Sequence, residues 1–141
     1  MKSKIANLIN WGLPYCAIAA MAYLIMFPQF VSHGVILGTD SIFHFNRFYD
    51  AAKQIQQLNF SYFQSNYSFQ QSGRIINAVY GPLFAYLNGA ILGVVGTWYQ
   101  YQIVTTFIVY LLGGIGMYRL GIRVHSKRIF AIICALIYMN I

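Results

Sequence analysis

Long runs of apolar residues dominate the chain and predict helices that cross a membrane. Residues 12–31 contain no charged side chain. Because a helix needs about 20 mostly apolar residues to cross the hydrocarbon layer of a bilayer, this run predicts a first spanning helix. Lys2, Lys4 and Trp11 precede it, and cations and an interfacial aromatic residue are typical of the boundary of a span.

A secretory signal peptide would begin in the same way, with Ala20-Met21-Ala22 as a cleavage site. The apolar run continues beyond Ala22, however, and exceeds the core of about 7–15 apolar residues found in signal peptides. We therefore expect the segment to remain as a membrane anchor. Pro14 is expected in its first turn, where a missing N–H costs little, and Pro28 is expected to kink or stop the helix.

A second apolar block, residues 75–118, contains no formal charge. Residues 101–118 are long enough for a second span, whereas 82–96 fall between a full span and an interfacial or re-entrant helix. On a helical projection of 82–96 the small residues share one side, and we expect that side to contact protein because small residues let backbones approach closely. The small side holds Ala85, Asn88, Gly89 and Gly96, and the opposite side holds Leu83, Leu87, Ile91 and Val94. Residues 129–141 are apolar but too few to cross, which predicts the start of another span in a longer protein.

Between the two spans, residues 40–58 are amphipathic with the helical period of about 3.6 residues. They predict an interfacial helix whose apolar side lies among lipid headgroups and whose polar side faces outward. The apolar side holds Ile42, Phe45, Tyr49 and Ala52, and the polar side holds Asp40, His44, Arg47, Ala51 and Gln54. Residues 59–74 are rich in Asn, Gln, Ser and aromatic side chains, a composition that suits either stacking on sugars or packing at the interface.

Composition and charge support a membrane protein. Of the 141 residues, 59% are hydrophobic and 8% are charged, whereas a soluble domain carries about 25% charged residues. This excludes a soluble globule and a disordered chain, and two cysteines do not make a disulfide scaffold. The net charge of +7 lies at the ends of apolar runs and not in a basic stripe, which argues against nucleic-acid binding. The expected fold is an all-α integral membrane protein, a polytopic helical bundle with interfacial helices in a first outer loop at 32–100.

The distribution of Lys and Arg restricts the orientation, since cations are enriched in cytoplasmic loops. With spans at 12–31 and 101–118 and a cytoplasmic N-terminus, six cations lie inside and three in the outer loop. The inside set is Lys2, Lys4, Arg119, Arg123, Lys127 and Arg128, and the outside set is Arg47, Lys53 and Arg74. If 82–96 also spans, an external N-terminus gives seven inside and two outside. The charge count leaves both arrangements open, and the two lysines before the first helix favour the cytoplasmic start.

The candidate chemistry lies at the start of the amphipathic helix. Asp40 has two interpretations: it could cap the helix N-terminus, or it could act as a base or metal ligand over a lipid-linked substrate at the outer membrane boundary. His44 and Arg47 could bind a phosphate or steady the acid, or they could form only a surface salt bridge. Asp50 is expected to have a structural role, paired with Arg47 or Lys53. Phosphate-binding loops, paired-cysteine metal sites and Ser-His-Asp signatures are absent from the sequence.

Short motifs occur in a fixed order along the chain. They are Gly38-Thr39-Asp40, Phe43-His44, Arg47, Tyr80-Gly81-Pro82-Leu83-Phe84, Tyr86-Leu87, Gly116-Met117-Tyr118-Arg119 and the segment from Ala131 to Tyr138. Together they resemble the N-terminal part of polytopic GT-C-type membrane glycosyltransferases, in particular bacterial YfhO-like and related multi-spanning proteins.

The resemblance implies a transferase of the bacterial plasma membrane whose first outer loop carries a catalytic acid. The implied donor is a sugar on a polyprenyl-phosphate carrier, and the implied acceptor is an envelope polymer or lipid on the outer face. Asp40 occupies the position of the loop acid and would take the proton of the acceptor hydroxyl. Some relatives carry two neighbouring acids there; Ser41 follows Asp40 in this chain, so a divalent metal is not indicated and the cofactor stays unknown. The alternatives are a polytopic transporter or flippase and a non-catalytic envelope-assembly protein.

Overall fold

The computed structural model describes the backbone of residues 2–125 and 127–141 and the side chains of residues 12–125 and 127–141. The side chains of Lys2 and Lys4, which favour the cytoplasmic start, and of the expected interfacial residue Trp11 lie outside this part. The chain forms two compact units: unit 1 comprises Met1–Gly34 and Ile103–Ile141, and unit 2 comprises Val35–Gln102. Unit 2 therefore nearly coincides with the loop at 32–100 that the apolar runs set apart.

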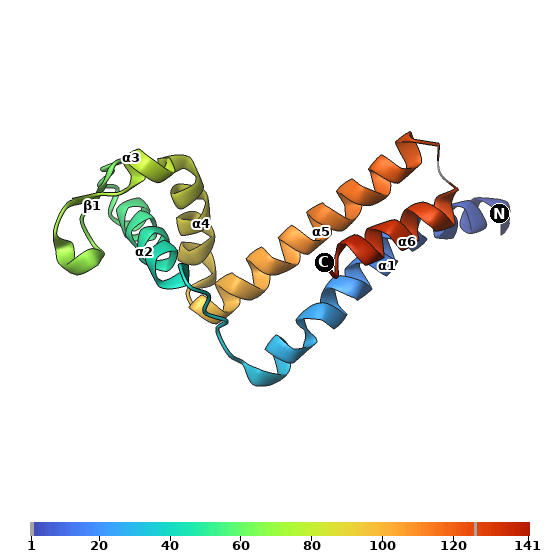
Figure 1. Cartoon of the computed structure of the whole chain (residues 1–141), viewed down its shortest axis with the longest axis horizontal. Helices are drawn as coiled ribbons and strands as arrows, with labels where there is room; N and C mark the ends of the chain where they lie inside the picture. The colour runs from blue at the N-terminus through green and yellow to red at the C-terminus, as the bar shows by residue number, and fades with distance from the viewer. Residues whose placement is uncertain (1, 126) are drawn as a thin grey trace. The chain divides into compact units, whose positions relative to one another are not determined.

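Unit 1 is built from three helices, α1 (Lys2–Ser32), most of α5 (Trp98–Arg123) and α6 (Arg128–Tyr138). Figure 1 shows α6 lying beside α1, and the two helices are in contact. Two segments, Gly12–Ser32 and Trp98–Arg123, are long and apolar enough to cross a membrane. The helices expected at 12–31 and 101–118 are thereby confirmed as helices of membrane-spanning length, and α5 extends beyond the expected bounds at both ends.

The two prolines of α1 do not interrupt it. The helix begins at Lys2, so Pro14 lies in its interior and not in a first turn, and the helix continues past Pro28 to Ser32. The expected first-turn position of Pro14 was therefore wrong, and Pro28 does not stop the helix. A proline removes one backbone N–H from the ladder, and the residues after Pro28 retain theirs, so the last turn can form.

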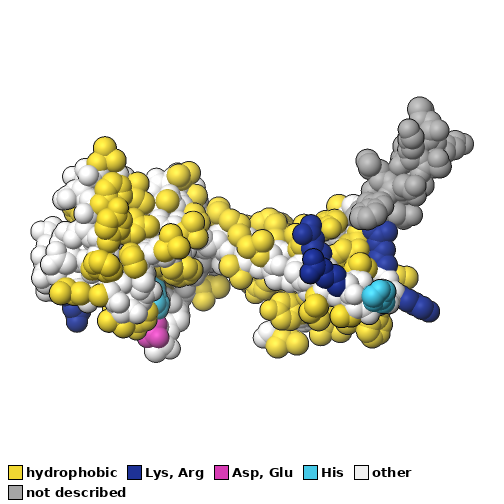
Figure 2. Space-filling model, turned by 90° about the horizontal axis from the view of Figure 1, so that it is seen from above, with side chains coloured by type: hydrophobic (Ala, Val, Ile, Leu, Met, Phe, Trp, Pro, Cys, Tyr) yellow, Lys and Arg dark blue, Asp and Glu magenta, His cyan; other side chains and the backbone are white. Residues whose placement is uncertain are grey.

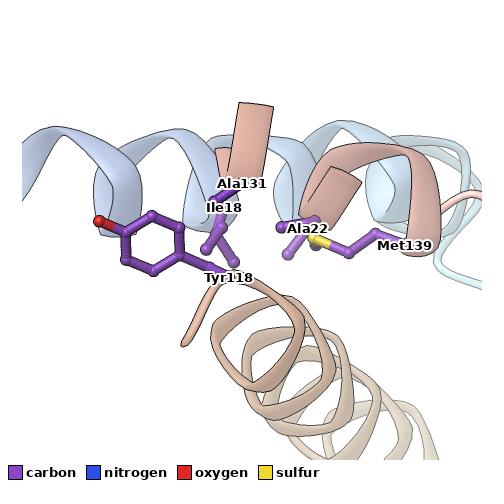
Figure 3. Packing of buried hydrophobic residues seen from close by; sticks show 6 residues of the cluster. Ile18, Ala22, Tyr118, Ala131 and Met139 are labelled. Atoms are coloured by element: carbon purple, nitrogen blue, oxygen red, sulfur yellow. The ribbon is translucent and has the colours of Figure 1, made fainter. Parts of the chain in front are cut away.

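Small side chains allow the helices of unit 1 to approach closely. Figure 3 shows side chains of one buried cluster, formed by Ile18 and Ala22 of α1, Tyr118 of α5, Ala131 of α6 and Met139, which directly follows α6. A Cβ atom built on Gly114 of α5 would lie 2.6 Å from Ile18 Cγ2 and 2.7 Å from Met139 Sδ. A larger residue here would force the Ile18 and Met139 side chains to move, and small residues at close helix contacts are typical of helix pairs inside membranes.

The surface of unit 1 is largely apolar. Leu13, Leu24, Val109 and Leu112 are 58%, 63%, 67% and 67% exposed, and Figure 2 shows hydrophobic side chains over much of the visible face with Lys and Arg side chains grouped together. The cations of this unit that the structure describes are Arg119, Arg123, Lys127 and Arg128, all at or near the turn between α5 and α6. An apolar belt with cations at a helix turn is the pattern expected of membrane-spanning helices.

Unit 2 contains two main helices and a folded loop. Its elements are α2 (Ser41–Gln57), β1 (Gln64–Ser65), the 3-10 turn η1 (Phe69–Gln71), β2 (Arg74–Ile75), α3 (Asn77–Tyr80), α4 (Pro82–Val95) and the first turn of α5. The two short strands are antiparallel, with Gln64 opposite Ile75 and Ser65 opposite Arg74. The helices at 40–58 and 82–96 are confirmed, whereas the strand pair was not expected from the sequence.

The segments that enter and leave unit 2 are tied together. The Ile36 N–H donates to Gln102 Oε1 at 2.8 Å, and Gln102 Nε2 donates to the Ile36 carbonyl oxygen at 2.8 Å. These reciprocal bonds close the loop at the point where it joins α5.

The helices α2 and α4 pack along their lengths through the small side of α4 (Figure 1). Ala85, Asn88 and Gly89 are buried, as the helical projection predicted. Leu83, Leu87 and Val94 on the opposite side are 82%, 60% and 86% exposed. Ile91, expected on that side, is half-buried and packs against the buried cluster of unit 2, and Gly96 ends the helix at an exposed position.

The polar side of α2 faces the protein, contrary to the sequence-based expectation. Arg47, Asp50 and Gln54 are at most 1% exposed, whereas Ile42 and Tyr49 of the apolar side are 63% and 40% exposed. Polar groups can be buried when they are hydrogen-bonded, and the folded loop that follows α2 supplies the partners. The outward placement of the polar side is therefore wrong for Arg47 and Gln54, and the predicted apolar side is mixed, because Ala52 is 5% exposed and packs against α4.

Candidate functional site

Asp40 lies directly before α2, and its side chain is exposed. Although it holds the N-cap position, its carboxylate accepts no capping hydrogen bond. Ser41 makes the local contacts instead: the Gly38 N–H donates to Ser41 Oγ at 2.6 Å, and the Ser41 N–H donates to the Gly38 carbonyl oxygen at 3.2 Å. The capping interpretation of Asp40 is therefore contradicted, and the carboxylate is left open to solvent at the positive end of a helix.

Arg47 is enclosed where α2 meets α3 and the start of α4. It is 1% exposed, its Nε donates to Asn77 Oδ1 at 3.0 Å, and Nη2 donates to the Gly81 carbonyl oxygen at 3.2 Å. The Tyr80 ring lies 4.9 Å from its guanidinium carbon. Burial lowers the pKa of Arg47, and Tyr80 partly opposes this shift. In this position Arg47 joins three elements, and its charge is not presented at the surface.

His44 lies one turn after Asp40 and is half-buried. Its Nδ1 is 3.1 Å from Arg47 Nη1. Because a guanidinium can only donate hydrogen bonds, Nδ1 must accept, and the proton of the neutral ring is on Nε2. Phe43 and Tyr80 contact the ring at 5.3 Å and 5.6 Å between centroids. The structure thus brings the predicted residues His44 and Arg47 into direct contact.

Asp50 is the second acid of the chain, and it is buried against the loop. Its Oδ1 accepts the N–H groups of Tyr67 at 2.6 Å and Ser68 at 3.1 Å, and its Oδ2 accepts Gln54 Nε2 at 2.6 Å. The structural role expected of Asp50 is supported, but the expected partners were wrong. Arg47 binds Asn77 and Gly81, as described above, and Lys53 donates to Gln56 at 3.3 Å.

Gln54 completes this buried network and was not given a role from the sequence. Its Oε1 accepts the Ser61 N–H at 2.7 Å and the Tyr86 hydroxyl, and its Nε2 also donates to the Gln64 carbonyl oxygen at 3.0 Å. The spacing of Asp50 and Gln54, four residues apart on a helix, is the sequence signal that could have indicated this pair. The network fixes residues 61–68 against α2 and α4.

The hydroxyl of Tyr86 gives this network a pH dependence. Burial chiefly raises the pKa of Tyr86, the negative charges of Asp50 and Tyr62 add to the shift, and a hydrogen bond with the Ser61 backbone opposes it. The folded state therefore holds the proton more tightly than the unfolded chain does. This stabilisation is complete below the ordinary tyrosine pKa of about 10 and is lost as the pH rises through the higher pKa of the folded state.

We expect Tyr86→Phe to reduce the alkaline loss of stability. At neutral pH the variant should lose about 1 kcal/mol, because one hydrogen bond to Gln54 disappears. Above pH of about 10, its stability should decline less steeply than that of the wild type. Urea unfolding of the purified protein at a series of pH values measures both effects, and Tyr49→Phe serves as a comparison at an exposed tyrosine of α2. Parallel declines for wild type and Tyr86→Phe would contradict the assignment.

The turn after Ser68 has an unfavourable backbone conformation. Phe69, Gln70 and Gln71 have φ values of 49°, 60° and 58°, and a left-handed conformation costs about 1–2 kcal/mol for each residue with a side chain. The Gln71 N–H donates to the Ser68 carbonyl oxygen at 2.9 Å, and Asp50 holds the Ser68 N–H. Such conformations persist where surrounding contacts impose them, often near functional sites.

Within the described residues, no three His, Cys, Asp or Glu side chains come together in a way that could hold a metal ion. Comparisons of the chain with protein-family models, curated proteins and solved structures find no match. The features available for a functional assignment are therefore the exposed Asp40, the His44–Arg47 pair and the apolar helices.

Proposed function

We propose that the chain is the N-terminal part of a multi-pass membrane glycosyltransferase of the bacterial plasma membrane. It would transfer a sugar from a polyprenyl-phosphate carrier to an envelope polymer or lipid on the outer face, with the N-terminus of α1 in the cytoplasm. The ordered motifs described above motivate the donor class. The two helices of membrane-spanning length, which lie before and after most of unit 2 in the sequence, fit a polytopic protein with an outer domain.

The observation that carries the proposal is the free carboxylate of Asp40. A capping aspartate would be engaged by backbone N–H groups, whereas Asp40 is exposed and accepts no capping bond. An exposed carboxylate at the start of a packed helix has the position required of a general base, which must reach the proton that it removes.

In the proposed reaction, Asp40 takes the proton of the acceptor hydroxyl while the acceptor oxygen forms a bond to the anomeric carbon of the donor sugar. The bond between that carbon and the phosphate oxygen breaks, and its electron pair leaves with the polyprenyl phosphate. His44 lies one turn later on α2, and its Nε2–H could donate to the departing phosphate. Arg47 acts as a positioning residue, since its contact with His44 Nδ1 keeps the proton on Nε2.

The test is sugar transfer by the full-length protein with Asp40→Asn and Asp40→Ser. We expect both substitutions to lower transfer from a polyprenyl-phosphate-linked donor by at least about 100-fold, because a general base contributes about 10²–10⁴-fold. Expression and helix content should remain unchanged, since the carboxylate makes no capping bond. The readout is incorporation of labelled sugar by isolated membranes.

Asp40→Ser distinguishes the alternatives because serine is a good helix cap. Wild-type transfer by Asp40→Ser would mean that Asp40 has only a local structural role. That result would overturn the proposed mechanism and favour a non-catalytic envelope-assembly protein.

A further inference from the structure

A surface pocket in unit 2 is lined by residues other than Asp40, His44 and Arg47. It is a hollow wide open to solvent, with a volume of about 590 Å³, and is lined by Phe69, Gln70, Ser72 and Arg74. Small-molecule sites commonly measure about 300–1,000 Å³. All four residues lie after β1, and the last of them, Arg74, is the first residue of β2. They belong to the part of the loop that is rich in polar and aromatic side chains.

The lining combines an aromatic ring with polar and cationic groups. The Arg74 guanidinium carbon is 5.5 Å from the centroid of the Phe69 ring, and Arg74 is exposed. Gln70 is also exposed and adds an amide. The Ser72 hydroxyl donates to the Phe69 carbonyl oxygen at 2.9 Å, and its oxygen can accept a hydrogen bond from a ligand. An aromatic ring suits the C–H face of a sugar, amides and hydroxyls suit its hydroxyl groups, and a guanidinium suits a phosphate or carboxylate.

The backbone that builds the pocket is held in place from inside unit 2. The left-handed residues Phe69–Gln71 follow Ser68 directly, and the Ser68 N–H donates to the buried Asp50. A lining fixed before the ligand arrives costs less to order during binding than a flexible loop does. The left-handed backbone of this turn places Gln70 and Ser72 in the same pocket as Phe69.

One aromatic residue connects the pocket with the candidate catalytic histidine. The Phe43 ring contacts Phe69 at 5.7 Å and His44 at 5.3 Å between centroids. Phe43 also contacts Tyr80 at 5.3 Å, which lies against Arg47. The pocket residue Phe69 and the His44–Arg47 pair are thus linked through the Phe43 ring within unit 2.

We propose that this pocket binds a sugar carrying an anionic group, a phosphate or a carboxylate. This rests on the proposed function and names the class of sugar that the site accepts. Arg74 pairs with the anionic group, and Phe69 supports the ring of the sugar. Gln70 and Ser72 supply hydrogen bonds to its hydroxyl groups.

Binding to the full chain in lipid nanodiscs tests the proposal without sugar transfer. The probes are N-acetylglucosamine 1-phosphate, glucuronic acid, neutral N-acetylglucosamine and inorganic phosphate, each titrated by ligand-observed NMR. We expect at least one anionic sugar to bind about tenfold or more tightly than the neutral sugar and than inorganic phosphate. The first two probes distinguish a phosphate from a carboxylate as the preferred group.

Two substitutions and two matched controls assign the binding to this pocket. Arg74→Gln should remove the preference for the anionic sugar, while Lys53→Gln, which removes a cation elsewhere in unit 2, should retain it. Phe69→Leu should weaken every sugar probe, while Phe60→Leu should weaken none. Since Arg74 is exposed, Arg74→Gln should fold normally, and a circular dichroism spectrum matching the wild type confirms this.

Equal binding of the anionic sugar by wild type and Arg74→Gln would overturn the inference, as would equal binding of inorganic phosphate and anionic sugars. If Asp40→Asn abolishes transfer but Arg74→Gln changes no binding, this inference fails and the proposed function stands. If Arg74→Gln abolishes anionic-sugar binding but Asp40→Asn transfers sugar normally, the pocket stands and the proposed mechanism fails.

Discussion

Replacing Gly89 by alanine is expected to separate α2 from α4. A Cβ atom on Gly89 would lie 2.7 Å from the Ala52 backbone nitrogen, 2.8 Å from Ala51 Cβ and 2.9 Å from the Phe48 carbonyl oxygen. Two of these atoms belong to the backbone of α2 and cannot rotate away, so the helices must move apart. Overpacking of this kind costs about 1–3 kcal/mol and sometimes more, and we expect the upper end or complete loss of the contact.

Gly93→Ala is the matched control for this prediction. Gly93 lies one turn later on α4, and its added Cβ would meet only the Gln56 side chain, at 3.8 Å. Both substitutions gain about 1 kcal/mol of helix propensity, so Gly93→Ala should be neutral or stabilising. Trp98 stacks on Phe45 at 4.6 Å within unit 2, and its fluorescence during thermal unfolding in a Trp11→Phe background reports on this unit. A melting temperature of Gly89→Ala equal to that of Gly93→Ala would contradict the close packing.

The second large effect is expected from Asp50→Asn. The carboxylate accepts three hydrogen bonds in a buried site, and an amide at this position would place an NH₂ group against either Gln54 Nε2 or the loop N–H groups. Rotation of the Gln54 amide cannot resolve the conflict, because its oxygen already accepts from Ser61 and Tyr86. Hydrogen bonds to charged groups are worth about 1.5–3 kcal/mol each, so we expect a loss of about 2–4 kcal/mol.

Asp40→Asn provides the control, because it removes the same charge from an exposed position without a capping bond. Its stability should stay within about 0.5 kcal/mol of the wild type. Limited proteolysis should cut Asp50→Asn in residues 59–76 faster than Asp40→Asn, since the loop loses its attachment to α2. Equal cleavage rates for the two variants would show that Asp50 does not hold the loop.

The helices of this chain could be predicted from the sequence because apolar runs and helical periodicity are local properties. The helices at 40–58 and 82–96 were located within a residue or two, and the side of α4 that contacts protein was identified by Ala85, Asn88 and Gly89. These residues are small or can hydrogen-bond, so their burial against α2 follows from their own size and chemistry. The same reasoning failed for α2, whose polar side is buried.

The environment of α2 depends on partners that are distant in the sequence. Asp50 binds backbone groups of Tyr67 and Ser68, and Arg47 binds Asn77 and Gly81. A polar residue on an amphipathic helix usually faces water, and only the fold of the loop shows that these residues face protein. For the candidate site, the sequence located Asp40, His44 and Arg47 on one helix but could not show that Asp40 is free while Arg47 is enclosed.

The unequal exposure of the two acids has a practical consequence. The sequence contains only two acidic side chains, Asp40 and Asp50, and Asp50 is 1% exposed and fully engaged with hydrogen-bond donors. A water-soluble carbodiimide with an amine tag should therefore modify Asp40 and leave Asp50 unmodified in the folded protein. A spectroscopic probe could then be attached covalently at the N-terminus of α2 without introducing a cysteine.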